Sequence, residues 1–134
     1  MRLYISGPMS NRKDYNYPAF FQMESDLGEM GHEPINPARD APSPSPAHTW
    51  HFYMVRALRL FRNACDAIVV LPEWEVSRGA RIEVADAVRR GLTVYRLVNR
   101  TLQPVPMSEI RPGLSAMTEE DFVYLHQDID SLAG

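Results

Sequence analysis

The chain has 134 residues, of which 45% are hydrophobic and 23% charged, as in an ordinary single globular domain. Its formal net charge of −3 argues against a protein that coats nucleic acid, and no apolar run approaches the roughly 18 residues of a membrane span. The single cysteine, Cys65, excludes an intrachain disulfide and precedes an apolar run, which favours a core residue over a nucleophile. The chain starts directly with a strand pattern instead of a signal peptide, so a cytoplasmic protein is expected.

Four short apolar or β-branched runs have the length and composition of strands. They lie at residues 3–5, 34–36, 67–71 and 93–97. Between the runs, apolar residues recur at helical spacing, and proline or glycine stands near several helix ends. The helices expected from this spacing cover about residues 20–30, about residues 48–63 and residues 77–90, and a last helix starts at Thr118 and extends to Ile129.

Two segments are rich in residues that interrupt regular structure. Residues 37–46 form a proline-rich loop of small and polar residues. Residues 101–113 hold three prolines and a glycine, and they are expected to form a second loop. The alternation of strands and helices predicts an α/β fold, a doubly wound parallel sheet of four or five strands in a three-layer α/β/α arrangement. Residues 1–134 are expected to form one domain, with its core in residues 1–98.

The strand, turn and helix in residues 66–83 carry most of the functional information. The run 67–71 is typical of a buried parallel strand, and ligands bind beyond the carboxyl ends of such strands. Ser77 can cap the helix that follows, and the small residues Gly79 and Ala80 let a ligand approach the first N–H groups of that helix. A helix start of this kind suits a phosphate or a 5′-hydroxyl group.

Glu83 lies about one turn into this helix, beside the apolar residues that would face the sheet. A partly solvated glutamate near the positive helix end would stay ionised, which a carboxylate nucleophile requires. The alternative is an exposed glutamate that pairs with Arg81, Arg89 or Arg90. The spacing by itself leaves both interpretations open.

The loop after the first strand should face this turn, because the carboxyl ends of adjacent strands converge in a doubly wound sheet. The residues that it brings near the ligand are Tyr4, Ser6, Gly7, Pro8 and Met9. Tyr4 could hold the nucleophile by its hydroxyl group or could be a core tyrosine. Gly7 would let the backbone pass close to a sugar or phosphate. Arg12 could meet an anion or remain a solvated charge.

Two other side chains of the central unit also have two interpretations. Asp66 begins the central strand, where it could donate a proton to a leaving base or be an ordinary strand-edge aspartate. Trp74 could stack on a base, or it could cover the sheet edge or a subunit contact. The four histidines do not occur at zinc spacings with cysteines, and no metal site is expected.

Several motifs together resemble the nucleoside 2-deoxyribosyltransferase-like superfamily, and in particular a small branch related to nucleoside 5′-monophosphate N-glycosidases. The resemblance covers about residues 1–98 and depends on the order and spacing of the motifs. These are Tyr4-Ile5-Ser6-Gly7-Pro8-Met9, Asp14-Tyr15-Asn16, Asn36-Pro37-Ala38, Cys65-Asp66-Ala67-Ile68-Val69-Val70-Leu71-Pro72 and Trp74-Glu75-Val76-Ser77-Arg78-Gly79-Ala80-Arg81-Ile82-Glu83.

The resemblance implies a flavodoxin-like fold and cleavage of the N-glycosidic bond of nucleosides or nucleotides by a helix-borne glutamate, whose position Glu83 occupies. It also implies that Tyr4 orients this nucleophile and that Asp66 is the acid near the leaving base. Transferases that act on free nucleosides tend to have an aspartate where Ser77 stands, whereas the monophosphate glycosidases have a serine that contacts phosphate. A nucleoside 5′-monophosphate is therefore the preferred substrate, with water as acceptor and no metal or organic cofactor.

The substrate-binding residues expected from the turn, the first loop and the resemblance are Ser6, Gly7, Pro8, Met9, Arg12, Asn36, Trp74, Ser77, Gly79 and Ala80. Pro8 and Ser10 stand where the glycosidases carry a serine and an arginine for phosphate, which leaves Arg12 as the substitute. The resemblance further implies a homodimer or higher homo-oligomer. Its partner would be a small-molecule nucleoside or nucleotide, not a nucleic acid polymer or a membrane.

Three alternatives stay open beside hydrolysis. One is base exchange by a nucleoside 2-deoxyribosyltransferase, another is a module that binds a nucleotide without turnover, and the third is an oligomerising structural protein. A carboxylate beside a bound phosphate would weaken a pure anion-binding site, so Glu83 favours an enzyme. The sequence leaves open which base is removed and whether the sugar is ribose or 2′-deoxyribose.

Overall fold

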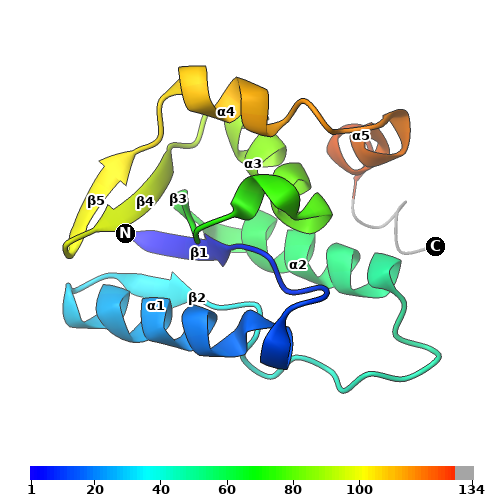
Figure 1. Ribbon diagram of the computed structural model, residues 1–134, viewed down its shortest axis with the longest axis horizontal. Helices are drawn as coiled ribbons and strands as arrows, with labels where there is room; N and C mark the ends of the chain where they lie inside the picture. Colours follow the sequence, from blue (N-terminus) through cyan, green and yellow to red (C-terminus); the bar gives the residue numbers. More distant parts are fainter. Residues whose placement is uncertain (129–134) are drawn as a thin grey trace.

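The computed structural model of the protein describes residues 1–128, which form a five-stranded sheet with helices on both faces (Figure 1). The strand order is β2-β1-β3-β4-β5, in which the first four strands pair in parallel and β5 runs antiparallel to β4. The strands are β1 (Arg2–Ser6), β2 (Glu33–Ile35), β3 (Ala67–Val70), β4 (Val94–Val98) and β5 (Thr101–Pro104). The predicted α/β, flavodoxin-like architecture is confirmed, with one antiparallel strand at the edge.

Helices α1, α2, α3 and α5 correspond to helices that the apolar spacing predicts, whereas α4 lies in a segment that was expected to be a loop. They are α1 (Tyr17–Glu29), α2 (Trp50–Ala64), α3 (Arg78–Arg89), α4 (Met107–Gly113) and α5 (Glu119–His126), with 3-10 turns η1 (Lys13–Asn16) and η2 (Trp74–Val76). Thr118 caps α5 in a reciprocal capping box with Asp121, as its sequence indicates. The expected end of this helix, Ile129, lies outside the described residues. No helix in residues 1–128 has the length and apolar character needed to cross a membrane.

The two faces of the sheet bury different helices because side chains alternate along each strand. On one face, Leu3, Ile5 and Val69 pack in a cluster with Phe20 and Leu27 of α1. This cluster contains no residue of α2 or α3. Among the described helices, α1 alone therefore covers this face of the sheet.

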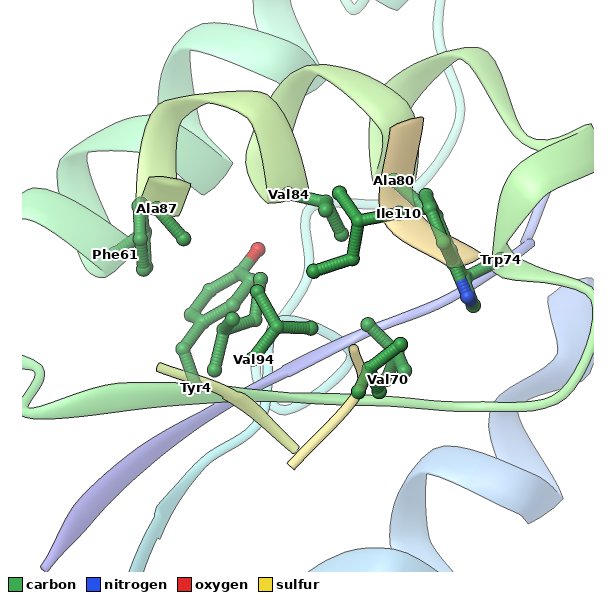
Figure 2. Close-up of a cluster of buried hydrophobic side chains, with 11 residues drawn as sticks. Tyr4, Phe61, Val70, Trp74, Ala80, Val84, Ala87, Val94 and Ile110 are labelled. Carbon is green, nitrogen blue, oxygen red and sulfur yellow. The ribbon is translucent and has the colours of Figure 1, made fainter. Parts of the chain in front are cut away.

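The opposite face carries α2, α3 and the turn before α3. Tyr4 and Val70 from the strands meet Phe61 of α2 and Val84 of α3 in one buried cluster. Figure 2 shows the Tyr4 hydroxyl pointing away from the sheet toward the helix that carries Val84. Strand β1 thus directs the Tyr4 hydroxyl into the interior, on the side of the sheet that α3 covers.

Residues 101–113 do not form the expected loop. Asn99 and Arg100 both adopt left-handed backbone conformations, with φ of 49° and 60°, and they join β4 to β5 as a two-residue hairpin. The prediction failed because neither position is glycine, the usual signal for such a turn. The prolines are compatible with regular structure here, since Pro104 ends an edge strand and Pro106 precedes α4.

Candidate functional site

The start of α3 positions Glu83 beside the sheet. The Ser77 hydroxyl accepts a hydrogen bond from the Ala80 N–H at 3.2 Å, so Ser77 is the N-cap that the sequence predicts. Glu83 follows in the second turn, and only 5% of its surface is exposed. A carboxylate is seldom buried to this degree unless it is paired. Its partners therefore decide what it can do.

Two hydroxyl groups of β1 hold the Glu83 carboxylate. The Tyr4 hydroxyl donates to Oε2, and the Ser6 hydroxyl donates to Oε1 at 2.8 Å. Tyr4 and Ser6 are two positions apart on one strand, so both side chains point to the same face of the sheet. Within residues 1–128, no arginine, lysine or histidine forms an ion pair with this carboxylate. The alternative of an exposed, arginine-paired glutamate is wrong.

Burial controls the protonation of this cluster. It raises the pKa of Glu83 to about 7, although the hydrogen bonds from Tyr4 and Ser6 act in the opposite direction, and nearby Asp86 adds to the rise. Burial also raises the pKa of Tyr4 well above its ordinary value, so the phenol keeps its proton and remains a donor. Desolvation thus acts against the ionisation of Glu83 that the positive helix end was expected to favour.

The first turn of α3 retains donors for an anion, but not all those expected. The Ala80 N–H is already bonded to Ser77, and Ala80 itself is buried. Helix geometry leaves the N–H groups of Arg78 and Gly79 without an intrahelical partner. A side-chain carbon added at Gly79 would lie 3.6 Å from the sulfur of Met54, which is ordinary contact. Gly79 is therefore not needed to avoid a steric clash. Its lack of a side chain leaves the N–H groups of the first turn accessible to an anion.

The loop after β1 is tightly packed. A side-chain carbon at Gly7 would lie 2.7 Å from Cβ of Leu71, so this glycine is required by the neighbouring strand end. Pro8 is buried, and its carbonyl accepts a hydrogen bond from Asn16 at 2.9 Å. Met9 packs with the α1 cluster. These three residues shape the loop, while only Ser6 of the same segment reaches Glu83.

Arg12 and Asn36 also lie at the carboxyl edge of the sheet. Arg12 forms an ion pair with Glu73, with its guanidinium nitrogen 2.8 Å from the carboxylate. Asn36 follows β2, and its side-chain oxygen accepts a hydrogen bond from the N–H of Ala38 at 2.9 Å. Asn36 therefore shapes the next loop. The pairing of Arg12 with Glu73 was not predicted from the sequence.

Asp66 and Trp74 are not brought to Glu83. Asp66 is exposed, and its carboxylate accepts a hydrogen bond from the N–H of Arg2 at 2.7 Å. It precedes β3 and therefore lies at the amino edge, about 13 Å along the strand from the level of Ser6. Trp74 is 4% exposed, and a side-chain carbon at Gly113 would lie 2.5 Å from its ring. The ring belongs to the core, so it is not open to stack on a base.

Two cavities in the structure lie away from Glu83. A groove of about 730 Å³ runs beside α2, and its lining includes Ile35, Phe52 and Arg56. A second cavity of about 370 Å³ borders Trp74 and Gly113. Neither lining contains Glu83, which is itself buried in this structure. Within residues 1–128, no group of three or more histidine, cysteine, aspartate or glutamate side chains is placed so that it could hold a metal ion.

Several contacts in and beside the site were not predicted from the sequence. Ser6 was expected to contact a ligand, but it binds Glu83, a role indicated by its position two residues after Tyr4. Asp86 is fully buried and bonded to Arg62 and Arg90. The spacing of Asp86 and Arg90 is a helical i,i+4 pair that sequence can suggest. The contact with Arg62 on another helix has no such signal.

Comparisons with known proteins give one family and one fold. Residues 1–96 match the model of a family described as "Domain of unknown function (DUF4406)". None of the curated proteins matches the chain. A solved structure of a 2-deoxyribosyltransferase from the psychrotolerant bacterium Bacillus psychrosaccharolyticus is similar over 98% of this chain and 96% of that chain, with a TM-score of 0.58 and 17% sequence identity. At this identity the similarity shows a shared fold.

Proposed function

We propose that this chain, which belongs to the family described as a domain of unknown function (DUF4406), cleaves the N-glycosidic bond of nucleoside 5′-monophosphates. Glu83 is the nucleophile, and water is the acceptor. The observation that carries the proposal is a buried carboxylate at the carboxyl edge of a parallel sheet, with two hydroxyl donors and no cation partner among residues 1–128. A carboxylate of this kind is unusual as a structural element, because buried charges are normally paired.

The first step forms a glycosyl ester. An oxygen of ionised Glu83 attacks C1′ while the bond from C1′ to the base nitrogen breaks, and that nitrogen takes the electron pair and a proton from solvent. Tyr4 and Ser6 hold the two carboxylate oxygens, so attack from one fixed direction needs little reorganisation. The negative carboxylate also stabilises positive charge that develops on the sugar ring.

The second step returns Glu83 to its starting form. A water oxygen attacks C1′, the ester bond from C1′ to the glutamate oxygen breaks, and the water proton passes to solvent. Because each displacement inverts C1′, the product sugar retains the anomeric configuration of the substrate. The Tyr4 and Ser6 hydroxyl groups can stabilise the carboxylate as it leaves, since both remain donors throughout.

A monophosphate is preferred because of the groups at the start of α3. Ser77 carries no charge there, whereas an aspartate at this position would repel a phosphate dianion. The N–H groups of Arg78 and Gly79 and the positive helix end attract an anion. The distance from this turn to Glu83 is under two helical turns, which suits a sugar with its phosphate at the helix start and C1′ at the carboxylate.

Base exchange is the second candidate function. The fold neighbour is a 2-deoxyribosyltransferase, and transfer differs from hydrolysis only in whether a base or water attacks the glycosyl ester. A nucleotide-binding module without turnover is the third candidate. We also expect a homodimer or higher homo-oligomer in the cytoplasm, and light scattering of the purified protein measures the assembly.

The test is base release from a panel of ribo- and deoxyribonucleosides and their 5′-monophosphates, with and without an added acceptor base. Hydrolysis predicts free base from monophosphates without acceptor, and Glu83→Gln abolishes the release. Exchange that needs the acceptor base assigns transferase activity instead. No release from any compound, combined with ligand-induced thermal stabilisation that persists in Glu83→Gln, would assign the binding module.

A further inference from the structure

We propose that Arg12 and Glu73 form an exchangeable pair, in which the phosphate of a substrate replaces the Glu73 carboxylate on Arg12. This inference rests on the proposed function and identifies Glu73 as a residue that competes with the substrate phosphate for Arg12 and does not take part in the chemistry. The pair joins the loops that follow β1 and β3, at the edge of the sheet where Ser6 contacts Glu83.

The pair joins the two central loops of the carboxyl edge. Arg12 belongs to the loop after β1 and Glu73 to the loop after β3, and these strands are neighbours in the sheet. One guanidinium nitrogen of Arg12 lies 2.8 Å from the Glu73 carboxylate. Ser6, at the end of β1, contacts Glu83 at the same edge. The pair thus lies at the edge of the sheet that also carries the contact between Ser6 and Glu83.

The carboxylate of Glu73 is held by Arg12 and not by packing. The Glu73 side chain is 60% exposed and that of Arg12 is 33% exposed, so the carboxylate can turn into water. Glu73 adopts a left-handed conformation with φ of 66°, which is uncommon for a residue other than glycine, asparagine or aspartate. Such conformations are concentrated at ligand sites and switch regions. Solvent competes well for both partners of an exposed pair of this kind.

Two other arginines near this edge have partners that a ligand cannot easily replace. Arg78 binds the buried carboxylate of Asp121 at 2.6 Å. Arg56 donates to the backbone carbonyls of Pro37 and Arg39. In contrast, Arg12 is paired with an exposed side chain that can turn away into water. The partner of Arg12 is therefore exchangeable at small cost.

A phosphate dianion is a stronger acceptor than the carboxylate that it would replace. It carries more charge, and its oxygens can accept two parallel hydrogen bonds from one guanidinium group. A nucleoside without phosphate has only a hydroxyl group to offer and leaves the pair closed. Glu73 consequently competes with the phosphate for Arg12 and weakens phosphate binding to a small degree, while Arg12 provides the preference for phosphorylated compounds.

The test measures binding of the sugar that hydrolysis would release, so it does not depend on turnover. Isothermal titration calorimetry compares ribose 5-phosphate and 2-deoxyribose 5-phosphate with the unphosphorylated sugars. Glu73→Gln is expected to tighten binding of one or both phosphorylated sugars about two- to fivefold, the range of an exposed ion pair. Arg12→Gln is expected to weaken it about tenfold or more, as for a hydrogen bond to a charged group. The unphosphorylated sugars should bind all variants alike.

Two neighbouring variants control for net charge. Glu75→Gln removes an exposed negative charge two residues from Glu73, and Lys13→Gln removes an exposed positive charge beside Arg12. Both are expected to bind the phosphorylated sugars like the wild type. The proposal is overturned if Glu73→Gln leaves binding unchanged or weakens it, if Lys13→Gln has the effect of Arg12→Gln, or if no phosphorylated sugar binds any variant.

The base-release panel keeps this result separate from the proposed function. Glu83-dependent release with no change of phosphate preference in Glu73→Gln would refute the exchange and leave the enzyme in place. Selective binding of a phosphorylated sugar that responds to Glu73, without release of any base, would support the exchange and contradict hydrolysis. Thermal denaturation of each variant shows whether these surface changes leave the fold intact.

Discussion

Two buried carboxylates on α3, one turn apart, have opposite surroundings. Asp86 is fully buried, and Arg62 donates to both its oxygens at 3.0 Å while Arg90 donates to one at 3.0 Å. Glu83 is almost as buried, but its partners are the hydroxyl groups of Tyr4 and Ser6. The same helix therefore carries one carboxylate that is compensated by cations and one that is not.

The difference separates a structural role from a chemical one. Arg62 also donates to the backbone carbonyl of Tyr124 at 2.6 Å, so the Asp86 cluster fastens α5 to α2 and α3. A carboxylate committed to two arginines is a poor nucleophile, because its electron pairs are engaged. The charge on ionised Glu83 has no such cation partner among the described residues, so it is costly to bury, and attack on C1′ would remove that charge. The two residues thus predict opposite responses to neutralisation.

The largest expected effect is on catalysis at Glu83. Glu83→Gln should lower the rate of base release by about a thousandfold or more, as for loss of a covalent nucleophile. Initial rates by chromatography under substrate saturation measure the loss. Asp86→Asn, assayed on its folded fraction, should retain far more activity. Equal losses in the two variants would show that the comparison does not separate chemistry from structure.

The next effect is on stability at Asp86. Asp86→Asn leaves Arg62 and Arg90 without their buried partner, and we expect it to lower the free energy of unfolding by about 3–5 kcal/mol. Urea denaturation at pH 7, followed by circular dichroism, measures the change. A loss below about 1 kcal/mol would mean that the buried ion cluster contributes no more than a surface pair.

Neutralising Glu83 should stabilise the protein at high pH. Its pKa in the folded state is raised to about 7 from an ordinary 4.5, so the folded protein binds the proton more tightly than the unfolded chain. The resulting loss in the free energy of unfolding is absent below the pKa of the unfolded chain, grows as the pH rises from 4.5 to 7 and is then constant. Glu83→Gln should therefore gain up to about 3 kcal/mol at pH 8 and nothing near pH 4. Unfolding curves at both pH values provide the measurement, and a variant destabilised at pH 8 would contradict it.

The pH dependence of activity gives a smaller test. Because Glu83 must be ionised to attack, kcat/KM should rise with pH through a midpoint near 7. Tyr4→Phe removes a hydrogen bond that lowers the pKa of Glu83, so the midpoint should move to higher pH, and the rate at pH 7 should fall about tenfold. Rate profiles of both proteins between pH 5 and 9 decide this. An unchanged midpoint in Tyr4→Phe would exclude the proposed role of the phenol.

The sequence predicts the parallel strands from the periodicity of its apolar residues. Strand order left two interpretations of Tyr4 open, and only the resemblance to the superfamily implied the contact with Glu83 that the structure contains. The sequence misplaces Asp66, although a residue that starts a parallel strand lies at the edge opposite to the ligand. Trp74 shows a different limit, since the contact with Gly113 that buries it joins residues far apart in the chain. The network of Asp86 and Arg62 could not be predicted for the same reason, because the crossing of two helices sets it.

The most direct test of the account is the covalent intermediate on Glu83. Wild-type protein is mixed with the monophosphate that releases base, quenched in acid during turnover and analysed by intact mass and peptide mapping. The account predicts a pentose 5-phosphate adduct on Glu83, absent from Glu83→Gln, and a product sugar of retained configuration. Base release with inversion at C1′ and no adduct would contradict it, because water would then attack the substrate directly.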